Sequence, residues 1–204
     1  MNGRPLTEQV YDDSRWITEP FHLFDCCMEN DGAAALILVS AERARDFAKP
    51  VWLLGAASGA GYRAAAQPHA QPLYGSAGHA PLAANLYAMA GVSPADVGVV
   101  QCYDNFTGGV AMSLVDHGFF RAEDANDFLT LDNLLAPSGR LPLNTSGGNI
   151  AEVYLQGLEL VLEGVRQVRG TSTSQAARSD VSLVISAPMV SPTSELLFGS
   201  EATL

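Results

Sequence analysis

Five short apolar runs constrain the fold of this chain more than any other feature of its sequence. They occupy residues 34–39, 51–58, 97–104, 180–186 and 194–199. Each run is shorter than a typical helix and is bounded by glycine, proline or polar residues, which is typical of buried strands. Segments with helical patterns separate most of the runs. This alternation predicts an α/β layered domain with a mostly buried sheet.

Capping residues mark the ends of the predicted helices. Ser40 is a predicted N-cap, and Gly91 and Gly118 are predicted to close two helices. The last helix is the longest, and it would contain Gly157. The helices are expected at residues 40–49, 80–91, 106–118 and 150–169.

The chain divides into a lead-in and one domain. Residues 1–30 are polar and mixed, so we expect a loop-rich lead-in, and residues 31–204 carry the predicted domain. Within that domain, residues 59–78 are rich in glycine, alanine and proline. They form a predicted loop of a length that is usually functional or mobile.

Charge and composition exclude several classes of function. The formal net charge is −11 and the pI is about 4.6, which argues against nucleic acids and anionic membranes as partners. No apolar run reaches the roughly 20 residues of a membrane span. The start of the sequence lacks a basic stretch followed by an apolar one, so we expect a cytoplasmic protein. The three cysteines suggest neither a disulfide framework nor a Cys-x-x-Cys metal site.

Two polar segments follow predicted secondary structure in positions that suit chemistry. Cys102–Thr107 links a buried strand to a helix, and ligands of α/β sheets tend to bind beyond the carboxyl ends of strands. Leu143–Asn149 is a glycine-containing turn at a predicted helix start, where free backbone N–H groups can hold an oxyanion. From the residues alone, ordinary packing of Tyr103 and a simple tight turn stay open as alternatives.

Three segments are similar to the C-terminal half of thiolase-superfamily proteins. They are DCCMENDGAAALILVSAERA, YDNFTGGVAMSLVDHGF and LPLNTSGGNIAEVYLQGLELV, which begin at Asp25, Tyr103 and Leu141. The resemblance covers essentially the whole chain and is greatest to the sterol-carrier-protein-x-like, or lipid-transfer, branch. It implies a layered mixed β-sheet with helices on both faces. It also implies that the first thiolase half, which carries the nucleophilic cysteine, is absent.

The sequence departs from the family where thiolases keep their catalytic residues. The Asn-Glu-Ala-Phe motif is replaced by Tyr103-Asp104-Asn105-Phe106, and Tyr154 occupies the position of the catalytic histidine. No cysteine lies in Ser186–Met189, where the family has its second catalytic cysteine. Without these groups, the chain cannot run thiolysis or Claisen condensation by the family's route.

Tyrosines at both altered positions resemble the thiolase-like aldolases of bacterial steroid side-chain degradation. The resemblance implies retro-aldol cleavage of a β-hydroxyacyl-CoA into a ketone and a shorter acyl-CoA, with Tyr103 and Tyr154 as catalytic residues. Asn105, Asn144 and the Gly147-Gly148 pair are the candidates for substrate binding. The two asparagines fit strand-end and turn hydrogen bonding equally well.

Retro-aldol cleavage needs a base for the β-hydroxyl, an electron sink and an acid for the carbanion. Lys49, the only lysine, precedes a proline in a turn and is a poor Schiff-base residue. The histidines show no metal-ligand spacing, and His79 and His117 are expected at the surface or at helix caps. A CoA thioester can take the electrons as an enolate, so no cofactor and no metal are expected. We expect Tyr154, near the start of its helix, to act as the base, and Tyr103 to donate the proton.

A thiolase half without its twin exposes apolar surface, which we expect on helices 106–116 and 150–169. Besides the acyl-CoA substrate, three arrangements stay open: a separately encoded first half, a fragment of a longer chain, or a homodimer. The resemblance to the aldolases also implies an OB-fold partner protein. The alternative function is a non-catalytic module that binds acyl-CoA or only assembles with a partner. A third is an acyltransferase whose cysteine comes from another chain.

Overall fold

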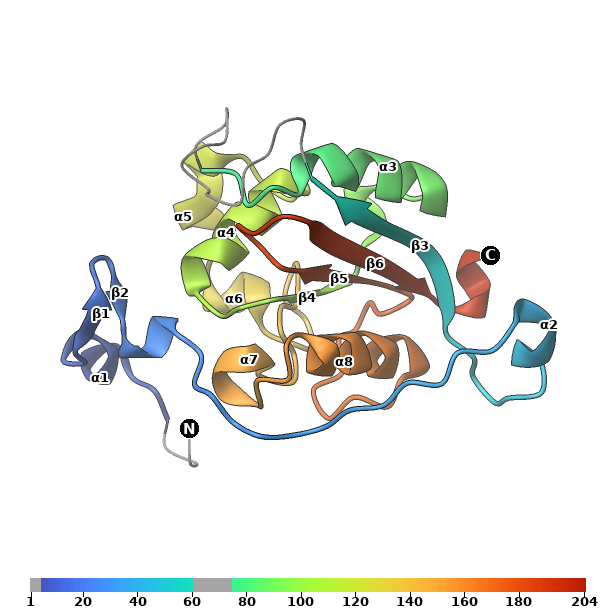
Figure 1. Ribbon diagram of the computed structural model, residues 1–204, viewed down its shortest axis with the longest axis horizontal. Coiled ribbons are helices and arrows are strands. Elements are labelled where there is room, and N and C mark those ends of the chain that lie inside the picture. Colours follow the sequence, from blue (N-terminus) through green and yellow to red (C-terminus); the bar gives the residue numbers. More distant parts are fainter. Residues whose placement is uncertain (1–4, 61–74) are drawn as a thin grey trace.

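A mixed four-stranded sheet forms the centre of the protein (Figure 1). The structure is a computed structural model that describes residues 5–60 and 75–204. The strand order is β3 (Trp52–Gly59), β6 (Thr193–Gly199), β5 (Val181–Ser186) and β4 (Val99–Cys102). β4 pairs with β5 in parallel, and the other two pairings are antiparallel. The α/β prediction and four of the five predicted strands are confirmed.

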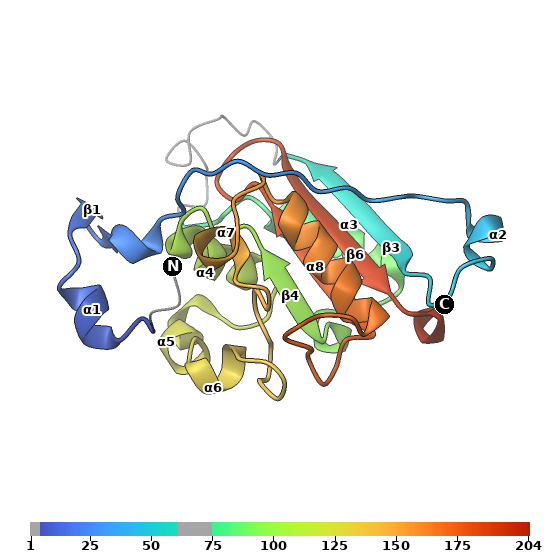
Figure 2. The same ribbon diagram turned by 90° about the horizontal axis from the view of Figure 1, so that it is seen from below.

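Helices cover both faces of this sheet, as Figures 1 and 2 show. α3 (Ala80–Ala90) packs against β3 and β6, and α8 (Leu158–Arg169) packs against β4 and β5 from the other face. All residues of β4 are buried, and so are the first five of β5. Cover on both faces explains why these strands are nearly continuous apolar runs in the sequence.

Alternate residues of β5 divide the core into two clusters. Leu183 and Ile185 pack with Leu86 of α3, whereas Val184 packs with Leu160 of α8. Tyr103 belongs to the cluster on the α8 face. The two faces of the sheet therefore have separate apolar cores, and only one of them contacts the tyrosine.

Shorter elements surround this centre. Ser40 accepts a hydrogen bond from the Arg43 N–H, and Gly91 and Gly118 adopt left-handed conformations, so the predicted caps are confirmed. The remaining helices are α1 (Glu8–Asp12), α2 (Ala41–Ala44), α4 (Thr107–Asp116), α5 (Ala125–Phe128), α6 (Leu131–Leu134) and α7 (Gly148–Ala151). A hairpin joins β1 (Trp16–Thr18) to β2 (Phe21–His22), and 3-10 turns cover Leu23–Asp25, Pro94–Asp96, Ala122–Asp124 and Glu201–Thr203.

A buried carboxylate, Asp25, is one of the contacts that attach the lead-in to the domain. Asp25 accepts hydrogen bonds from the Tyr11 hydroxyl at 2.7 Å and from the Thr107 hydroxyl at 2.8 Å. Because Thr107 begins α4, these bonds fix α1 next to the domain. The predicted boundary near residue 30 stays a prediction. Of the predicted loop over residues 59–78, residues 61–74 lie outside the described part.

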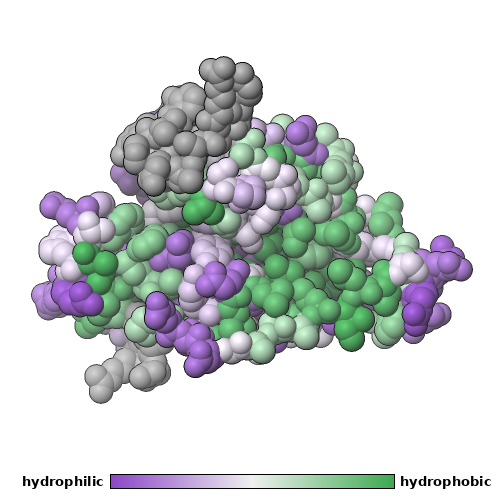
Figure 3. Space-filling view, viewed as in Figure 1, coloured by the Kyte–Doolittle hydropathy of each residue, from purple (hydrophilic) through white to green (hydrophobic). Residues whose placement is uncertain are grey.

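The predicted strand over residues 34–39 is wrong. The segment is extended but joins no strand among the described residues, and Ile37 and Leu38 are 90% and 85% exposed. In Figures 1 and 2 it passes alongside α7 and α8, outside the sheet. Figure 3 shows a broad hydrophobic area on the face that carries this segment, α8 and β3. An apolar run indicates that a segment is to be buried, but not against which partner.

The single helix predicted over residues 150–169 is also wrong. It is divided into α7 and α8 by a segment in which Gln156 and Gly157 have φ angles of 58° and 88°. Left-handed backbone at two consecutive residues cannot continue a right-handed helix. Tyr154 therefore lies in the irregular connection between the helices. Exposed apolar side chains gather on residues 36–39. The two expected helix ranges expose Phe106 and Leu158, at 42% and 37%, but bury Leu114 and Leu160 fully.

Within the described residues, no helix has the length and hydropathy needed to cross a membrane.

The central position of β5 is testable by truncating one of its side chains. Leu183 is fully buried, so Leu183→Ala is expected to lower the free energy of unfolding by about 2–5 kcal/mol. The matched control, Leu131→Ala, removes a side chain that is 73% exposed and should change it by less than about 0.5 kcal/mol. Chemical denaturation followed by circular dichroism measures both. Equal losses would contradict the placement of β5.

Candidate functional site

Two tyrosines meet at the carboxyl end of β4. Tyr103 follows the strand directly, and its N–H donates to the carbonyl of Ile185 at 2.9 Å, which keeps it in register with β5. Tyr154 comes from the connection between α7 and α8. The two phenolic oxygens lie 2.8 Å apart, and the rings are nearly perpendicular, at 69°. The structure thus brings together the two residues that the sequence analysis selected.

The environment of Tyr103 keeps its hydroxyl protonated. Burial raises the pKa of Tyr103 above its ordinary value, and the hydrogen bond to Tyr154 and the nearby carboxylate of Glu159 raise it further. The Tyr103 hydroxyl is the donor toward the Tyr154 oxygen. A donated hydrogen bond stabilises negative charge on the oxygen that accepts it.

Gly157 makes room for the Tyr103 ring. A Cβ at Gly157 would lie 2.9 Å from the Cδ2 of Tyr103, closer than side-chain contacts allow. The same residue has the φ of 88° that ends the irregular connection before α8. One glycine therefore both turns the chain after Tyr154 and lets the connection approach the tyrosine ring.

Asp104 occupies the helix start at which we expected free backbone amides. Its Oδ1 accepts a hydrogen bond from the Asn149 N–H at 2.7 Å, and a Cβ at Gly148 would collide with its carboxylate. Burial raises the pKa of Asp104, although hydrogen bonds from the α7 backbone and Asn144 oppose this rise. The expectation of an open oxyanion site at this turn is wrong for the Asn149 amide. Instead, the Gly147-Gly148 turn packs against the carboxylate of Asp104, which directly follows Tyr103.

The two candidate asparagines make hydrogen bonds to backbone groups. Asn144 accepts from the Cys102 N–H at 2.7 Å and donates to the Cys102 carbonyl at 2.9 Å. Asn105 accepts from the Phe106 N–H at 3.1 Å. Asn144 thereby fixes the last residue of β4, from which Tyr103 projects. A role of either side chain in substrate binding stays a prediction.

The comparisons with known proteins identify the family of this chain. Residues 55–195 match the family model described as thiolase C-terminal domain-like. The chain belongs to this family. The resemblance on which the sequence analysis relied is therefore confirmed, and the tyrosine pair lies within the matched residues.

Two curated relatives are aldolases or lyases. The chain is 41% identical over 202 residues to a steroid side-chain-cleaving aldolase of Thermomonospora curvata. It is 39% identical over 207 residues to a 17-hydroxy-3-oxo-4-pregnene-20-carboxyl-CoA lyase of Mycobacterium tuberculosis. Each match covers 97% of this chain and 51% of the relative. The chain is thus homologous to steroid side-chain-cleaving aldolases and spans about half their length.

Solved structures give the same result for the fold. The structure described as Ltp2-ChsH2(DUF35) aldolase matches with a TM-score of 0.90 and 41% identity, over 97% of this chain and 52% of that one. The Acat5 thiolase of Ascaris suum, solved with coenzyme A, matches with a TM-score of 0.59 and 16% identity, over 97% and 44% of the two chains. The second match shows the shared fold alone.

Sequence reasoning missed two buried residues near the tyrosines. Glu159 is buried, and its Oε2 accepts from the Leu155 N–H at 3.0 Å, one residue after Tyr154. Burial raises the pKa of Glu159. The side-chain amide of Asn149 is also buried, with no hydrogen-bond partner among the residues described. The four-residue spacing of Glu159, Glu163 and Gln167 on one helix face was a signal that could have revealed the first of them.

The prediction that His79 and His117 are surface residues is wrong, although both do occupy helix caps. His79 is the N-cap of α3 and His117 the C-cap of α4. Both are buried against Glu195 of β6. Since Leu197 of β6 packs with α3, Glu195 two residues before it points to the same face, opposite the tyrosines.

The close approach of Gly157 to Tyr103 is testable by adding one methyl group. Gly157→Ala is expected to cost about 1–3 kcal/mol of folding stability through backbone strain, with a further loss from the collision with the ring. Gly91→Ala is the matched control, because Gly91 also has a positive φ, of 68°, but nothing within 4 Å of the added Cβ. Denaturation of both variants measures the difference. Equal losses would contradict the contact.

The raised pKa of Tyr103 predicts how stability depends on pH. Because the folded protein holds this proton to higher pH than the unfolded chain, its contribution is complete below about pH 10 and is lost as the pH rises further. In a spectrophotometric titration of phenol ionisation, Tyr103→Phe is expected to remove one late-ionising group. An unchanged late phase in this variant would refute the assignment.

Proposed function

We propose that this chain supplies the proton-transfer site of a thiolase-like aldolase. The reaction would be retro-aldol cleavage of a β-hydroxyacyl-CoA with a bulky, steroid-like acyl group. The observation that supports it best is the 2.8 Å contact between the hydroxyls of Tyr103 and Tyr154 at the end of β4. The homology to steroid side-chain-cleaving aldolases supports the reaction class.

The proposed reaction breaks one carbon–carbon bond. A base takes the proton of the β-hydroxyl, the bond between the α and β carbons breaks, and the β carbon becomes the carbonyl of the released ketone. The electron pair passes into the thioester carbonyl, which becomes an enolate. An acid then protonates the α carbon and leaves the shorter acyl-CoA. No redox partner is needed, because the electrons stay within the substrate.

The contacts of the two tyrosines favour a division of roles. Tyr103 is buried, retains its proton and donates toward Tyr154, which suits the acid. Tyr154 accepts this hydrogen bond, which suits the base, since the bond stabilises a developing phenolate. The argument from a helix start no longer applies, because Tyr154 lies beyond the end of α7. Its backbone N–H donates to Asn30 at 2.8 Å instead.

The residues around the pair retain separate proposed roles. Asn105, Gly147 and Gly148 lie in segments that adjoin the tyrosines and are the candidates for contacts with the thioester. Asn144 would act by positioning, because both atoms of its amide bind the backbone of Cys102. No cofactor is required beyond the CoA carried by the substrate.

The site would be completed by partners. The chain spans about half the length of the relatives, and it exposes the apolar residues 36–39. We propose that a first thiolase half covers this surface, either from the same protein or from a separate chain; a homodimer is the alternative. A DUF35 protein is a second proposed partner, since a DUF35 component is present in the solved aldolase with 41% identity. A cytoplasmic location stays part of the proposal.

Removing either phenolic hydroxyl tests the mechanism. Tyr103→Phe and Tyr154→Phe are each expected to lower turnover by about 10²-fold or more, because each would lose a proton-transfer group. The assay follows ketone release from a β-hydroxyacyl-CoA by the chain assembled with a first thiolase half and a DUF35 partner. Tyr11→Phe removes a hydroxyl that binds Asp25 in the lead-in and serves as the control.

Two outcomes would contradict the mechanism. Near wild-type turnover in both Phe variants would refute the role of the tyrosines. If the wild-type assembly binds acyl-CoA but releases no ketone, the chain is the non-catalytic module that the sequence left open.

A further inference from the structure

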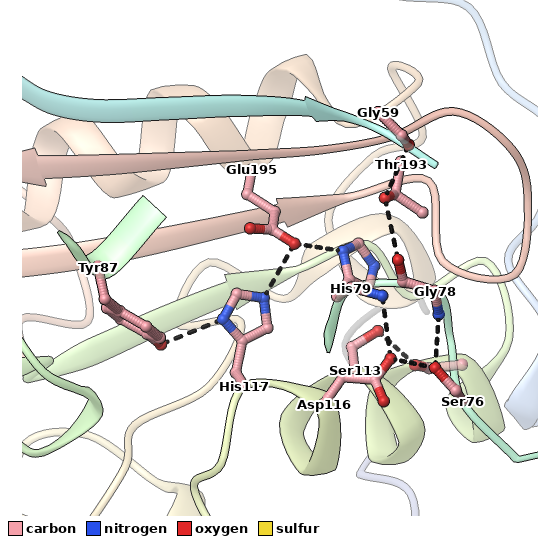
Figure 4. Close-up of polar contacts among 11 residues, drawn as sticks. Gly59, Ser76, Gly78, His79, Tyr87, Ser113, Asp116, His117, Thr193 and Glu195 are labelled. Atoms are coloured by element: carbon pink, nitrogen blue, oxygen red, sulfur yellow. Dashed lines mark hydrogen bonds and ion pairs between the residues drawn. The ribbon is translucent and has the colours of Figure 1, made fainter. Parts of the chain in front are cut away.

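A second cluster of ionisable side chains lies on the opposite face of the sheet from the tyrosines. Figure 4 shows His79 at the start of α3, His117 at the end of α4 and Glu195 on β6 pointing toward one another. The exposed fractions of these residues are 0%, 2% and 1%. Three elements that are distant in the sequence thus place two imidazoles and one carboxylate in a single buried space.

The distances among these groups are those of a ligand set. The Nδ1 of His79 lies 2.9 Å from the Oε1 of Glu195, and the Nε2 of His117 lies 3.5 Å from the same oxygen. All three ligand atoms lie within 4.8 Å of one another. Tetrahedral zinc, with bonds of about 2.0–2.1 Å to nitrogen and oxygen, separates its ligand atoms by about 3.3 Å. Small side-chain movements would therefore close the three groups around one ion.

The hydrogen bonds within the cluster do not satisfy its polar atoms. The Nε2 atoms of His79 and His117 and the Oε2 of Glu195 are buried and lack a hydrogen-bond partner among the described residues. Buried polar atoms without partners cost free energy, and a native protein rarely retains three of them together. A cation bound by the His79 Nδ1, the His117 Nε2 and the Glu195 Oε1 would use one of these atoms, the His117 Nε2, and neutralise the carboxylate.

The surroundings of the cluster resemble the outer shell of a metal site. The Tyr87 hydroxyl lies 3.1 Å from the Nδ1 of His117 and can fix which ring nitrogen faces Glu195. Asp116 accepts from the His79 N–H at 3.0 Å and from the Ser76 hydroxyl at 2.8 Å, which fixes the backbone of His79. The ligand-bearing residues are thus held by a second layer of contacts.

The three side chains offer two ring nitrogens and one carboxylate oxygen as donor atoms. Two imidazoles with one carboxylate form a ligand set found for zinc in proteins. Because the cluster is closed from solvent, an ion here would support the fold by joining α3 and α4 to β6.

We propose that His79, His117 and Glu195 form a structural binding site for a divalent transition-metal ion, with zinc as the best match. The site is independent of the aldolase proposal, since it lies on the other face of the sheet and its test needs no activity. No ligand spacing along the sequence marks this site, because its three residues lie in separate elements.

The test measures the metal content of the full chain after it has been loaded with zinc. After loading with zinc and removal of free metal, wild-type protein is expected to retain about one zinc ion per chain by elemental analysis. Glu195→Gln and His79→Gln are expected to lose it. His22→Gln is the matched control, because His22 is also buried but bonds to Ser14 in the lead-in. Wild-type protein without zinc, or zinc retained equally by Glu195→Gln, would overturn the proposal.

A second measurement covers the case in which the ligand variants do not fold. Zinc is expected to raise the melting temperature of chelator-treated wild-type protein, whereas magnesium is not, because nitrogen ligands disfavour it. Tyr87→Phe preserves the shape of the core and should weaken zinc binding by about 10- to 100-fold. No zinc-specific change in melting temperature would mean that the three residues form a proton-sharing network only, and the proposal would fail.

Discussion

The end of β4 is the constraint on which the candidate site depends. The strand stops at Cys102, and its last backbone groups need hydrogen-bond partners that no fifth strand among the described residues supplies. Asn144 satisfies both groups with its amide. Asp104 then binds the backbone of α7 at Asn149. These bonds fix the residues on either side of Tyr103, so the phenol projects from a rigid point toward Tyr154 rather than from a mobile loop.

The two faces of the sheet have different chemistry because side chains alternate along its strands. On the α8 face, Tyr103 and Leu160 share a cluster, and the tyrosine pair lies at its edge. On the α3 face, Glu195 lies among apolar residues and contacts two histidines. A carboxylate on a central strand is tolerated only with such partners, since burying an unpaired charge costs several kcal/mol. The sheet therefore separates the proposed proton-transfer site from the proposed metal site.

The apolar segment over residues 36–39 is exposed to solvent in this chain. Exposing these apolar side chains to water costs free energy. A protein rarely leaves such a run exposed unless another surface covers it. Six residues before this segment, the Asn30 side chain accepts a hydrogen bond from the Tyr154 N–H at 2.8 Å. A partner that covers the segment would thus lie near the site, which connects assembly with the geometry of the tyrosine pair.

The sequence by itself determined the local elements and the family. Apolar runs marked β3 to β6, glycines marked the ends of α3 and α4, and the residues that replace the thiolase motifs singled out Tyr103 and Tyr154. Only the tertiary structure decided what depends on distant partners. The sequence predicts a strand over residues 34–39, because an apolar run indicates burial but does not show which surface the segment packs against. The sequence predicts one helix over residues 150–169, because its apolar pattern does not show that the chain must approach the ring of Tyr103 closely at Gly157. The sequence predicts His79 and His117 at the surface or at helix caps, because nothing near them in the sequence reveals Glu195, which only folding brings to them.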